Sequence, residues 1–404
     1  MSPPLPELVV LSGGSEVAGL AVAEAAHAAA ISYAVFSLVP HSVLRDAPGC
    51  TAWVDLSLLR SDWPRLRDGF LRALAGLGHL NPGRLAILPT EDGGLRLLNE
   101  CRDEILEHGD FPRARALRMG GVDKAEVVDL VTRQGITDGL AASSVLDDPS
   151  EAIEAMDAFG DDTVFKPALK PLDMDLSGMG GQGVKVVTQR DAAESRGNVI
   201  DRLRVAWPLS RRWIAQPRLR TGAGLERSVC AVRGVEVHAC QVVEQAKYPR
   251  MGGTAYWVST EQRADLVPSA MRLMEALDVV GICELSYLPD VAGRGQLIEF
   301  NPRPWLQVGL MRHAGFPIVA ETIAALRGEA FTLPSPSLDA CDWLQLERMG
   351  MALLAGQSSL REFGRMLPLA FRQSTTVGGF GSALPMVRKR LVMRGIRKVF
   401  GFPL

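Results

Sequence analysis

The chain has 404 residues and a mass of 43.6 kDa, which is too long for one ordinary core and sufficient for two or three domains. Hydrophobic residues make up 47% of the sequence and charged residues 22%, a balance that excludes disordered and collagen-like chains. The formal net charge of −2 provides no overall field for nucleic acid, so no nucleic-acid partner is expected.

Cysteine usage and the N-terminal sequence indicate a cytoplasmic protein. The six cysteines show no CxxC or other metal-ligand spacing, so we expect reduced thiols. The first residues carry no basic segment of the kind that opens a secretory signal. Residues 25–44 hold no formal charge, but a helix ending near residue 30 and a strand over 32–38 account for them better than a membrane span.

The first third of the chain alternates strands with helices, which predicts a parallel α/β sheet. Strands are expected at 8–11, 33–38 and 84–89, and a helix at 16–30 follows a glycine turn. The glycines at 13, 14 and 19 follow the pattern GGxxxxG and not the dinucleotide pattern GxGxxG. A turn at the sheet edge that binds no nucleotide is therefore favoured there.

The middle of the chain predicts further helices and a set of strands with antiparallel character. A long helix is expected to run through residue 107, and a second one over 125–134. The glycine-rich loop 173–183 joins two expected strands and could close over a ligand. The expected strands of this part lie at 163–167, 184–187, 212–216, 226–232, 235–243, 281–288 and 296–300, the last two forming a hairpin.

The hairpin carries hard oxygen ligands on one face. Glu299 and Asn301 are two residues apart in the second strand, so their side chains point the same way, and Glu284 lies in the first strand. Carboxylate and amide oxygens suit Mg²⁺ beside phosphate. Arg303 falls on the same face and could neutralise a transferring phosphoryl group. The alternative is a solvated strand end that stops at a proline.

Two lysines and a glycine loop add a phosphate-binding character. Lys166 ends a strand beside the loop 177–183, and Lys124 begins a helix. Ammonium groups suit the phosphates of a nucleotide, and glycine N–H groups can cover them without interfering side chains. The loop lacks the GxxxxGK[ST] pattern, so it is not a P-loop.

The order of these residues over about 116–330 resembles the ATP-grasp superfamily, and E-F-N-P-R at 299–303 is the most specific motif. The resemblance implies an ATP site between two subdomains, with Arg303 and Lys166 catalytic and Glu284, Glu299 and Asn301 as metal ligands. It implies that ATP is contacted by Lys124, Lys166, Ser177, Gly178, Gly180, Gly181, Gly183, Gln216, Pro217, Leu219 and Glu226, where 216–219 form the adenine hinge and Glu226 binds the ribose. Pro217 departs from the family pattern, because a proline keeps its carbonyl acceptor and has no N–H to donate.

A further segment narrows the resemblance to one branch. Residues 245–256, Q-A-K-Y-P-R-M-G-G-T-A-Y, resemble a segment of carboxylate–amine ligases in the D-aspartate ligase and carbamoyl-phosphate-synthase-like group. There it lies near the acceptor site, so Lys247, Tyr248 and Arg250 are candidate substrate contacts, with the two cations suited to an anion. The alternative is a surface β-turn organised by Pro249 and the following glycines.

The C-terminal part does not resemble the superfamily core. Residues 330–336 read as a linker, and residues 361–404 hold nine Lys or Arg against one acid, Glu362. The segment 387–400 is amphipathic at helical period, as in helices that lie on anionic membranes or hold a lipid-linked acceptor. The alternative is a terminal helix docked on its own domain.

Together these observations predict an α/β protein with the ATP-grasp fold. A Rossmann-like domain is expected at 1–115, an ATP-grasp domain at 116–330 and a basic helical appendage at 331–404. The expected activity is ADP-forming ligation of a small carboxylate to an amine through an acyl phosphate, with ATP and Mg²⁺, or Mn²⁺, as cofactors. A homodimer is a further expectation from the superfamily. The alternatives are a macromolecular or lipid-linked acceptor, and a nucleotide-binding regulator without turnover.

Overall fold

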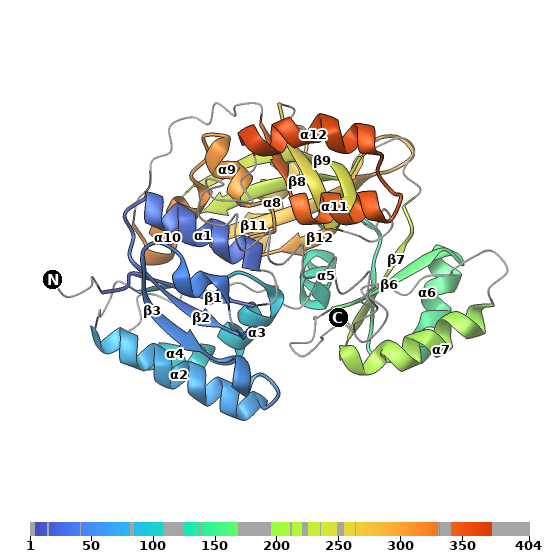
Figure 1. Ribbon diagram of the computed structural model, residues 1–404. Helices are drawn as coiled ribbons and strands as arrows, with labels where there is room; N and C mark the ends of the chain where they lie inside the picture. Colours follow the sequence, from blue (N-terminus) through green and yellow to red (C-terminus); the bar gives the residue numbers. More distant parts are fainter. Residues whose placement is uncertain are drawn as a thin grey trace, which may run out of the picture.

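The computed structural model in Figure 1 describes most of the chain. The described residues are 5–13, 16–40, 42–80, 85–107, 124–136, 139–168, 195–210, 212–219, 225–234, 236–248, 254–262, 264–329, 331 and 341–373. Several sequence predictions therefore lie outside them: the glycine loop 177–183 with the strand 184–187, Arg250, most of the linker 330–336, and the helix 387–400.

The N-terminal sheet is parallel, as predicted, and has four strands in the order β3-β2-β1-β4. Its strands are β1 (Leu8–Ser12), β2 (Tyr33–Ser37), β3 (Cys50–Asp55) and β4 (Ala86–Pro89). Helices α1 (Glu16–Ala28) and α2 (Trp63–Leu80) cover its two faces, so β1, β2 and β4 are buried throughout. The half-buried edge strand β3 was not predicted, because its sequence C-T-A-W-V-D lacks the continuous apolar run of its neighbours.

The helix predicted to run through residue 107 is two helices. α3 (Asp92–Glu100) ends at Cys101, whose N–H donates back to the Leu97 carbonyl, and α4 (Arg102–Glu107) follows. Cys101 is fully buried at this junction, so the break turns an apolar side chain into the core. The prediction of one uninterrupted helix was therefore wrong.

The central sheet has six antiparallel strands in the order β12-β11-β8-β9-β10-β13. Its strands are β8 (Arg227–Arg233), β9 (Val237–Tyr248), β10 (Thr254–Glu261), β11 (Gly281–Pro289), β12 (Gly295–Asn301) and β13 (Asp342–Leu344). The β11–β12 hairpin and the antiparallel β8–β9 pair confirm the sequence predictions. One face packs against α5 (Lys124–Arg133) and α8 (Val267–Ala276). On the other face, α9 (Gly309–His313) and α10 (Ile318–Arg327) form one core with α1 and the first sheet (Figure 1).

A third, smaller sheet has the order β5-β7-β6. It consists of β5 (Ser144–Leu146), β6 (Thr163–Pro167) and β7 (Trp213–Pro217), and its neighbours α6 (Ala152–Phe159) and α7 (Arg196–Ala206) form a separate hydrophobic cluster with it. Figure 1 shows this unit set apart from the two larger sheets, with α5 between them.

The described part of 341–373 packs on the central sheet. β13 pairs with β10, and α11 (Leu346–Leu354) and α12 (Leu360–Gln373) follow it. Leu344, Met349 and Met366 form a buried cluster with Tyr256 of β10. The domain boundaries at 115 and 330 stay predictions, and these contacts tie residues 342–366 to the central sheet. Within the part of the chain that the structure describes, no helix has both the length and the apolarity needed to cross a membrane.

Glu321 of α10 gives a first test of this packing. Only 4% of the residue is exposed, Oε1 lies 3.3 Å from His238 Nε2, and Oε2 has no partner among the described residues. Burial raises the pKa of Glu321 to about 8. The folded state thus binds this proton more tightly than the unfolded state, so stability falls as pH rises from about 4.5 and the loss is complete above about 8. We expect Glu321→Gln to match the wild type in unfolding free energy near pH 5 and to exceed it by about 1–3 kcal/mol at pH 9. Urea unfolding at both pH values checks this, and a variant no more stable at pH 9 would contradict it.

Candidate active site

The β11–β12 hairpin brings the predicted metal ligands together. Glu284 pairs in register with Asn301, and Ser286 with Glu299, so the three candidate ligands lie on one face of the central sheet. Asn301 Nδ2 donates to Glu284 Oε2 over 3.3 Å. Both residues are 6% exposed. Such burial is unusual for a carboxylate such as Glu284 and requires polar partners around it. The same-face arrangement predicted from the two-residue spacing is therefore what the structure shows.

Glu284 has the features of a functional carboxylate. Burial and the neighbouring charge of Glu299 raise its pKa to about 7, while Arg303 and the Asn301 amide oppose the rise. Gln307 Nε2 donates to the second oxygen, Oε1, over 3.2 Å. Two side-chain amides thus hold Glu284 in place, while burial and the like charge of Glu299 disfavour its ionised form. A cation bound by these oxygens would stabilise the ionised form of Glu284.

Both predicted lysines reach strand β12. Lys124 is the first residue of α5, and its ammonium pairs with the Glu299 carboxylate. Its backbone N–H donates to the Ala168 carbonyl over 3.2 Å, which fixes the helix start beside β6. Lys166 of β6 donates from Nζ to the Ile298 carbonyl over 3.4 Å. The α5 cation therefore pairs with a carboxylate of the hairpin, and the β6 cation bonds the backbone carbonyl of the residue before it.

Arg303 follows β12 and is held by three acceptors. Nε donates to Asp92 Oδ1 over 2.5 Å, Nη1 to the Pro304 carbonyl over 3.0 Å, and Nη2 to Asn301 Oδ1 over 3.5 Å. Burial alone lowers the pKa of Arg303, but Asp92, Glu299 and Glu284 raise it by more. Arg303 is therefore a fixed, permanently charged guanidinium next to the carboxylates.

The predicted adenine hinge lies at the end of β7. Gln216 pairs with Val164 and Pro217 with Thr163, so Gln216 and Lys166 share one face of the small sheet. Gln216 is 8% exposed and donates from Nε2 to Ser143 Oγ over 2.9 Å. Leu219 follows two residues after the strand. The adenine-binding role of residues 216–219 stays a prediction.

Lys247 lies in an ion cluster that sequence reasoning did not foresee. Its Nζ lies 2.6 Å from Glu226 Oε2 and 3.7 Å from Glu244 Oε2. Burial and Glu226 raise the pKa of Glu244 to about 8, and Lys247 opposes this rise. The ammonium thus already lies beside two carboxyl groups of this chain. Tyr248, the last residue of β9, packs against the cluster around Tyr256 and Leu344. Substrate contacts by Lys247 and Tyr248 stay predictions.

Replacing Lys247 by methionine tests this cluster. We expect a loss of about 1–3 kcal/mol in unfolding free energy at pH 9, because two largely buried carboxylates lose their counter-ion. The loss should be smaller at pH 6.5, where Glu244 is protonated. Thermal and urea unfolding at both pH values measure it. Arg204→Met, which removes an exposed pair with Asp201, is the control and should change little. A Lys247→Met protein as stable as the wild type at both pH values would contradict the cluster.

The donor set fits a magnesium ion that is also held by phosphate. Among the residues that the structure describes, no three His, Cys, Asp or Glu side chains are grouped to hold a metal ion by themselves. Glu284, Glu299 and Asn301 instead offer two carboxylates and one amide oxygen. Mg²⁺ is commonly bound by one or two carboxylates plus substrate phosphates and water, so this smaller set suits it.

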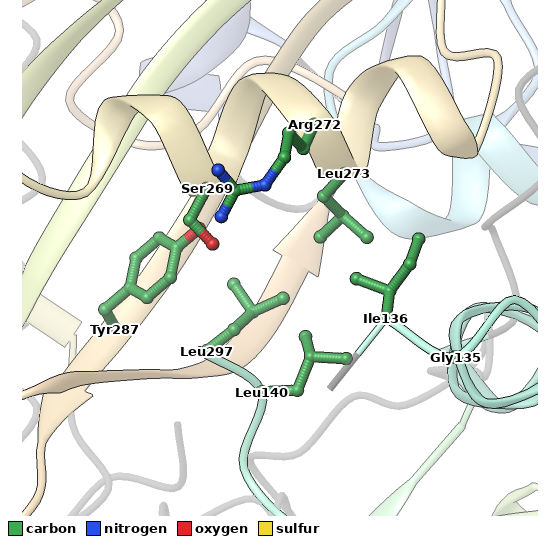
Figure 2. Close-up of a pocket in the computed structure, with 8 residues that line it drawn as sticks. All are labelled: Gly135, Ile136, Leu140, Ser269, Arg272, Leu273, Tyr287 and Leu297. Atoms are coloured by element: carbon green, nitrogen blue, oxygen red, sulfur yellow. The ribbon is translucent and has the colours of Figure 1, made fainter. Parts of the chain in front are cut away.

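A separate cavity lies on the opposite face of the central sheet. It has a volume of about 490 Å³ and lies between α8, the end of α5 and the hairpin. Figure 2 shows Tyr287, Leu297 and Ser269 along its wall. Tyr287 and Leu297 belong to the core on the α8 side of the sheet, whereas Glu284 and Glu299 face the other way. The cavity is therefore distinct from the carboxylate cluster.

Three residues of the site were missed by sequence reasoning: Asp92, Gln307 and Glu244. Asp92 follows β4, and the carboxyl ends of parallel strands are where functional groups gather in open sheets, so this signal was available. Glu244 pairs with the Glu226 backbone across β8 and β9, which a register for that hairpin could have indicated. Gln307 lies in the turn after β12 and carries no local signal.

Comparisons with known proteins identify the fold. No protein-family model matches the sequence, and a search of curated proteins gives no match. Among solved structures, the ADP complex of an N5-carboxyaminoimidazole ribonucleotide synthetase superposes with a TM-score of 0.64 at 15% identity, covering 88% of this chain and 87% of that one. The Staphylococcus aureus N5-carboxyaminoimidazole synthetase with ADP gives 0.62 at 13%, covering 91% and 88%. An L-amino acid ligase from Bacillus licheniformis gives 0.57 at 12%, covering 79% and 73%.

These likenesses, over most of both chains, show that the protein has the ATP-grasp fold, as the sequence predicted. At these identities the comparison establishes the fold and not the reaction. The narrower likeness to the D-aspartate ligase and carbamoyl-phosphate-synthase-like group is not tested by them and stays a prediction.

Proposed function

We propose that the protein is an ADP-forming ligase that activates a small carboxylate as an acyl phosphate and joins it to an amine. The observation that carries the proposal is that Arg303 and both lysines gather around the end of β12, where Glu284, Glu299 and Asn301 share one sheet face. Phosphoryl transfer needs positioned charge more than a protein nucleophile, and this cluster supplies it. The solved structures of like fold include complexes with ADP, which supports nucleotide binding by this chain.

The roles of the residues follow from their chemistry. Lys124 and Lys166 would hold the phosphates of ATP, with the hinge at Gln216 and Pro217 against the base. Glu284, Glu299 and Asn301 would hold Mg²⁺, which neutralises phosphate charge when bound. Arg303 would stabilise the charge on the transferring γ-phosphoryl group. Glu226, now seen paired with Lys247, is the proposed ribose contact.

The proposed reaction has two steps. An oxygen of the substrate carboxylate attacks the γ-phosphorus, the bond to the β-phosphate oxygen breaks, and ADP leaves. The amine nitrogen then attacks the acyl carbon, a C–N bond forms, the C–O bond to phosphate breaks, and the amine releases a proton. Arg303 and the lysines serve both steps, because phosphate carries negative charge in each. The membrane contact expected from residues 387–400, which lie outside the described residues, and the dimer stay predictions, and the proposal made here concerns small substrates.

Hydroxylamine trapping tests the proposal without knowledge of the natural amine. The full-length protein is incubated with MgATP, hydroxylamine and single carboxylates, including amino acids and dipeptides. A carboxylate that gives both ADP and its hydroxamate identifies the acyl donor. Candidate amines are then added in place of hydroxylamine. MgATP binding with no ADP release from any carboxylate would overturn the proposal in favour of a regulator or a macromolecular acceptor.

A further inference from the structure

We propose that Asp92, from the N-terminal sheet, is the positioning residue that fixes the Arg303 guanidinium for phosphoryl transfer. Asp92 Oδ1 accepts from Arg303 Nε over 2.5 Å, between residues 211 positions apart in the sequence. Both side chains are largely buried, with 14% of Arg303 and 18% of Asp92 exposed. The inference rests on the proposed function, because it assigns Arg303 to the reacting phosphate.

The backbone beside Asp92 packs closely against β1. Thr90, buried and directly after β4, donates from its backbone N–H to the Leu11 carbonyl of β1 over 3.0 Å. Gly94, in the first turn of α3, lies so close to β1 that an added Cβ would sit 3.3 Å from the Leu11 carbonyl oxygen. The start of α3 thus packs directly against the end of β1. This packing defines the position of the Asp92 backbone and so of its carboxylate.

Asp92 completes the orientation of the guanidinium. The bonds to Asp92, Pro304 and Asn301 use three of its five N–H donors and define its plane. Asn301 in turn donates to Glu284, so one chain of hydrogen bonds runs from Asp92 through Arg303 to the metal-ligand candidates. Groups that orient a functional side chain in this way change rates by about 10- to 100-fold when they are replaced.

A purely structural ion pair between the first and central sheets is the competing explanation. The chain offers a matched example of one: Glu7, just before β1, pairs with Arg327 of α10. Glu7 lies at the N-terminal end of β1, whereas Asp92 follows the opposite end of the neighbouring strand β4. Glu7→Gln therefore removes a comparable ion pair, between the N-terminal sheet and α10, away from the proposed active site.

The test measures kcat and the KM for MgATP in Asp92→Asn, Asp92→Glu and Glu7→Gln. We expect Asp92→Asn to lower kcat about 10- to 100-fold with KM within about twofold, and Asp92→Glu to recover part of the loss. Glu7→Gln should retain wild-type kcat. In an Arg303→Ala background Asp92→Asn should add little, because its effect acts through Arg303. Wild-type kcat in Asp92→Asn, equal loss in Glu7→Gln, or full additivity with Arg303→Ala would each overturn the inference.

A second measurement separates this inference from the proposed function. The rate at which phenylglyoxal modifies Arg303 is followed by peptide mass spectrometry in the full-length proteins, with no turnover required. Asp92→Asn should raise this rate several-fold over the wild type, and Glu7→Gln should not. If no carboxylate supports ADP release, the ligase proposal fails while this readout still decides whether Asp92 fixes Arg303. An unchanged modification rate in Asp92→Asn would overturn the positioning role.

Discussion

Replacing Arg303 by alanine is expected to lower the rate of ADP release about 10²–10³-fold, the usual cost of one lost electrostatic contact to a transition state. The guanidinium is buried, permanently charged and oriented by Asp92, Asn301 and the Pro304 carbonyl. Lysine at this position keeps the charge and loses the planar fork, so Arg303→Lys should also be strongly impaired while remaining better folded than Arg303→Ala.

The control for Arg303 lies in the hairpin that precedes it. Arg294 is 78% exposed and pairs with Asp290 in the turn between β11 and β12. Arg294→Ala should retain full activity, which shows that the hairpin tolerates loss of an arginine. The rate measured is ADP release from MgATP in the presence of the carboxylate identified by hydroxylamine trapping. Each rate is corrected for the fraction of the variant that is folded. Arg303→Ala with more than a third of wild-type activity would contradict its catalytic role.

Replacing Glu284 by glutamine is expected to reduce activity and raise stability together. The substitution keeps the shape of the side chain and removes a carboxylate whose ionised form is disfavoured by burial and by the charge of Glu299. Because the pKa of Glu284 is raised to about 7 in the folded protein, ionisation costs stability as pH rises through 7. Without magnesium, Glu284→Gln should therefore be more stable than the wild type at pH 8 and equal to it near pH 4.5. Gln307 can turn its amide to suit the new side chain.

The same substitution should lower ADP release by about 10²-fold and raise the magnesium concentration needed for half-maximal rate. Glu275→Gln, on the exposed side of α8, is the matched control and should change neither property. A rise in stability with a fall in activity is the signature of a residue kept for function. Full activity in Glu284→Gln, or lower stability at pH 8 without magnesium, would contradict its role.

The parts of the fold predicted correctly from sequence are those with strong local patterns. The β11–β12 hairpin follows from two apolar runs around a turn-forming loop, and its face follows from the two-residue spacing of Glu299 and Asn301. The parallel first sheet follows from the alternation of strands and helices. Local pattern also gave the helix beginning at Lys124.

The parts that were missed depend on long-range packing. Strand β3 is held by its neighbour β2, and β13 by pairing with β10, so neither is marked by its own sequence. The break at Cys101 places that side chain in the core of the first sheet. Asp92 and Gln307 join the site through tertiary contacts, and Lys247 meets Glu226 through the pairing of β8 with β9. No local signal encodes such pairings.

Transfer of ¹⁸O from the substrate carboxylate to inorganic phosphate tests the ligase proposal most directly. The carboxylate identified by trapping is labelled with ¹⁸O in both oxygens and incubated with MgATP, an amine and the wild-type protein. Formation of an acyl phosphate moves one labelled oxygen onto the phosphorus, so each phosphate released should carry one ¹⁸O and ADP should carry none. Release of ADP with unlabelled phosphate would mean that water, and not the carboxylate, attacks ATP, and would contradict the proposed reaction.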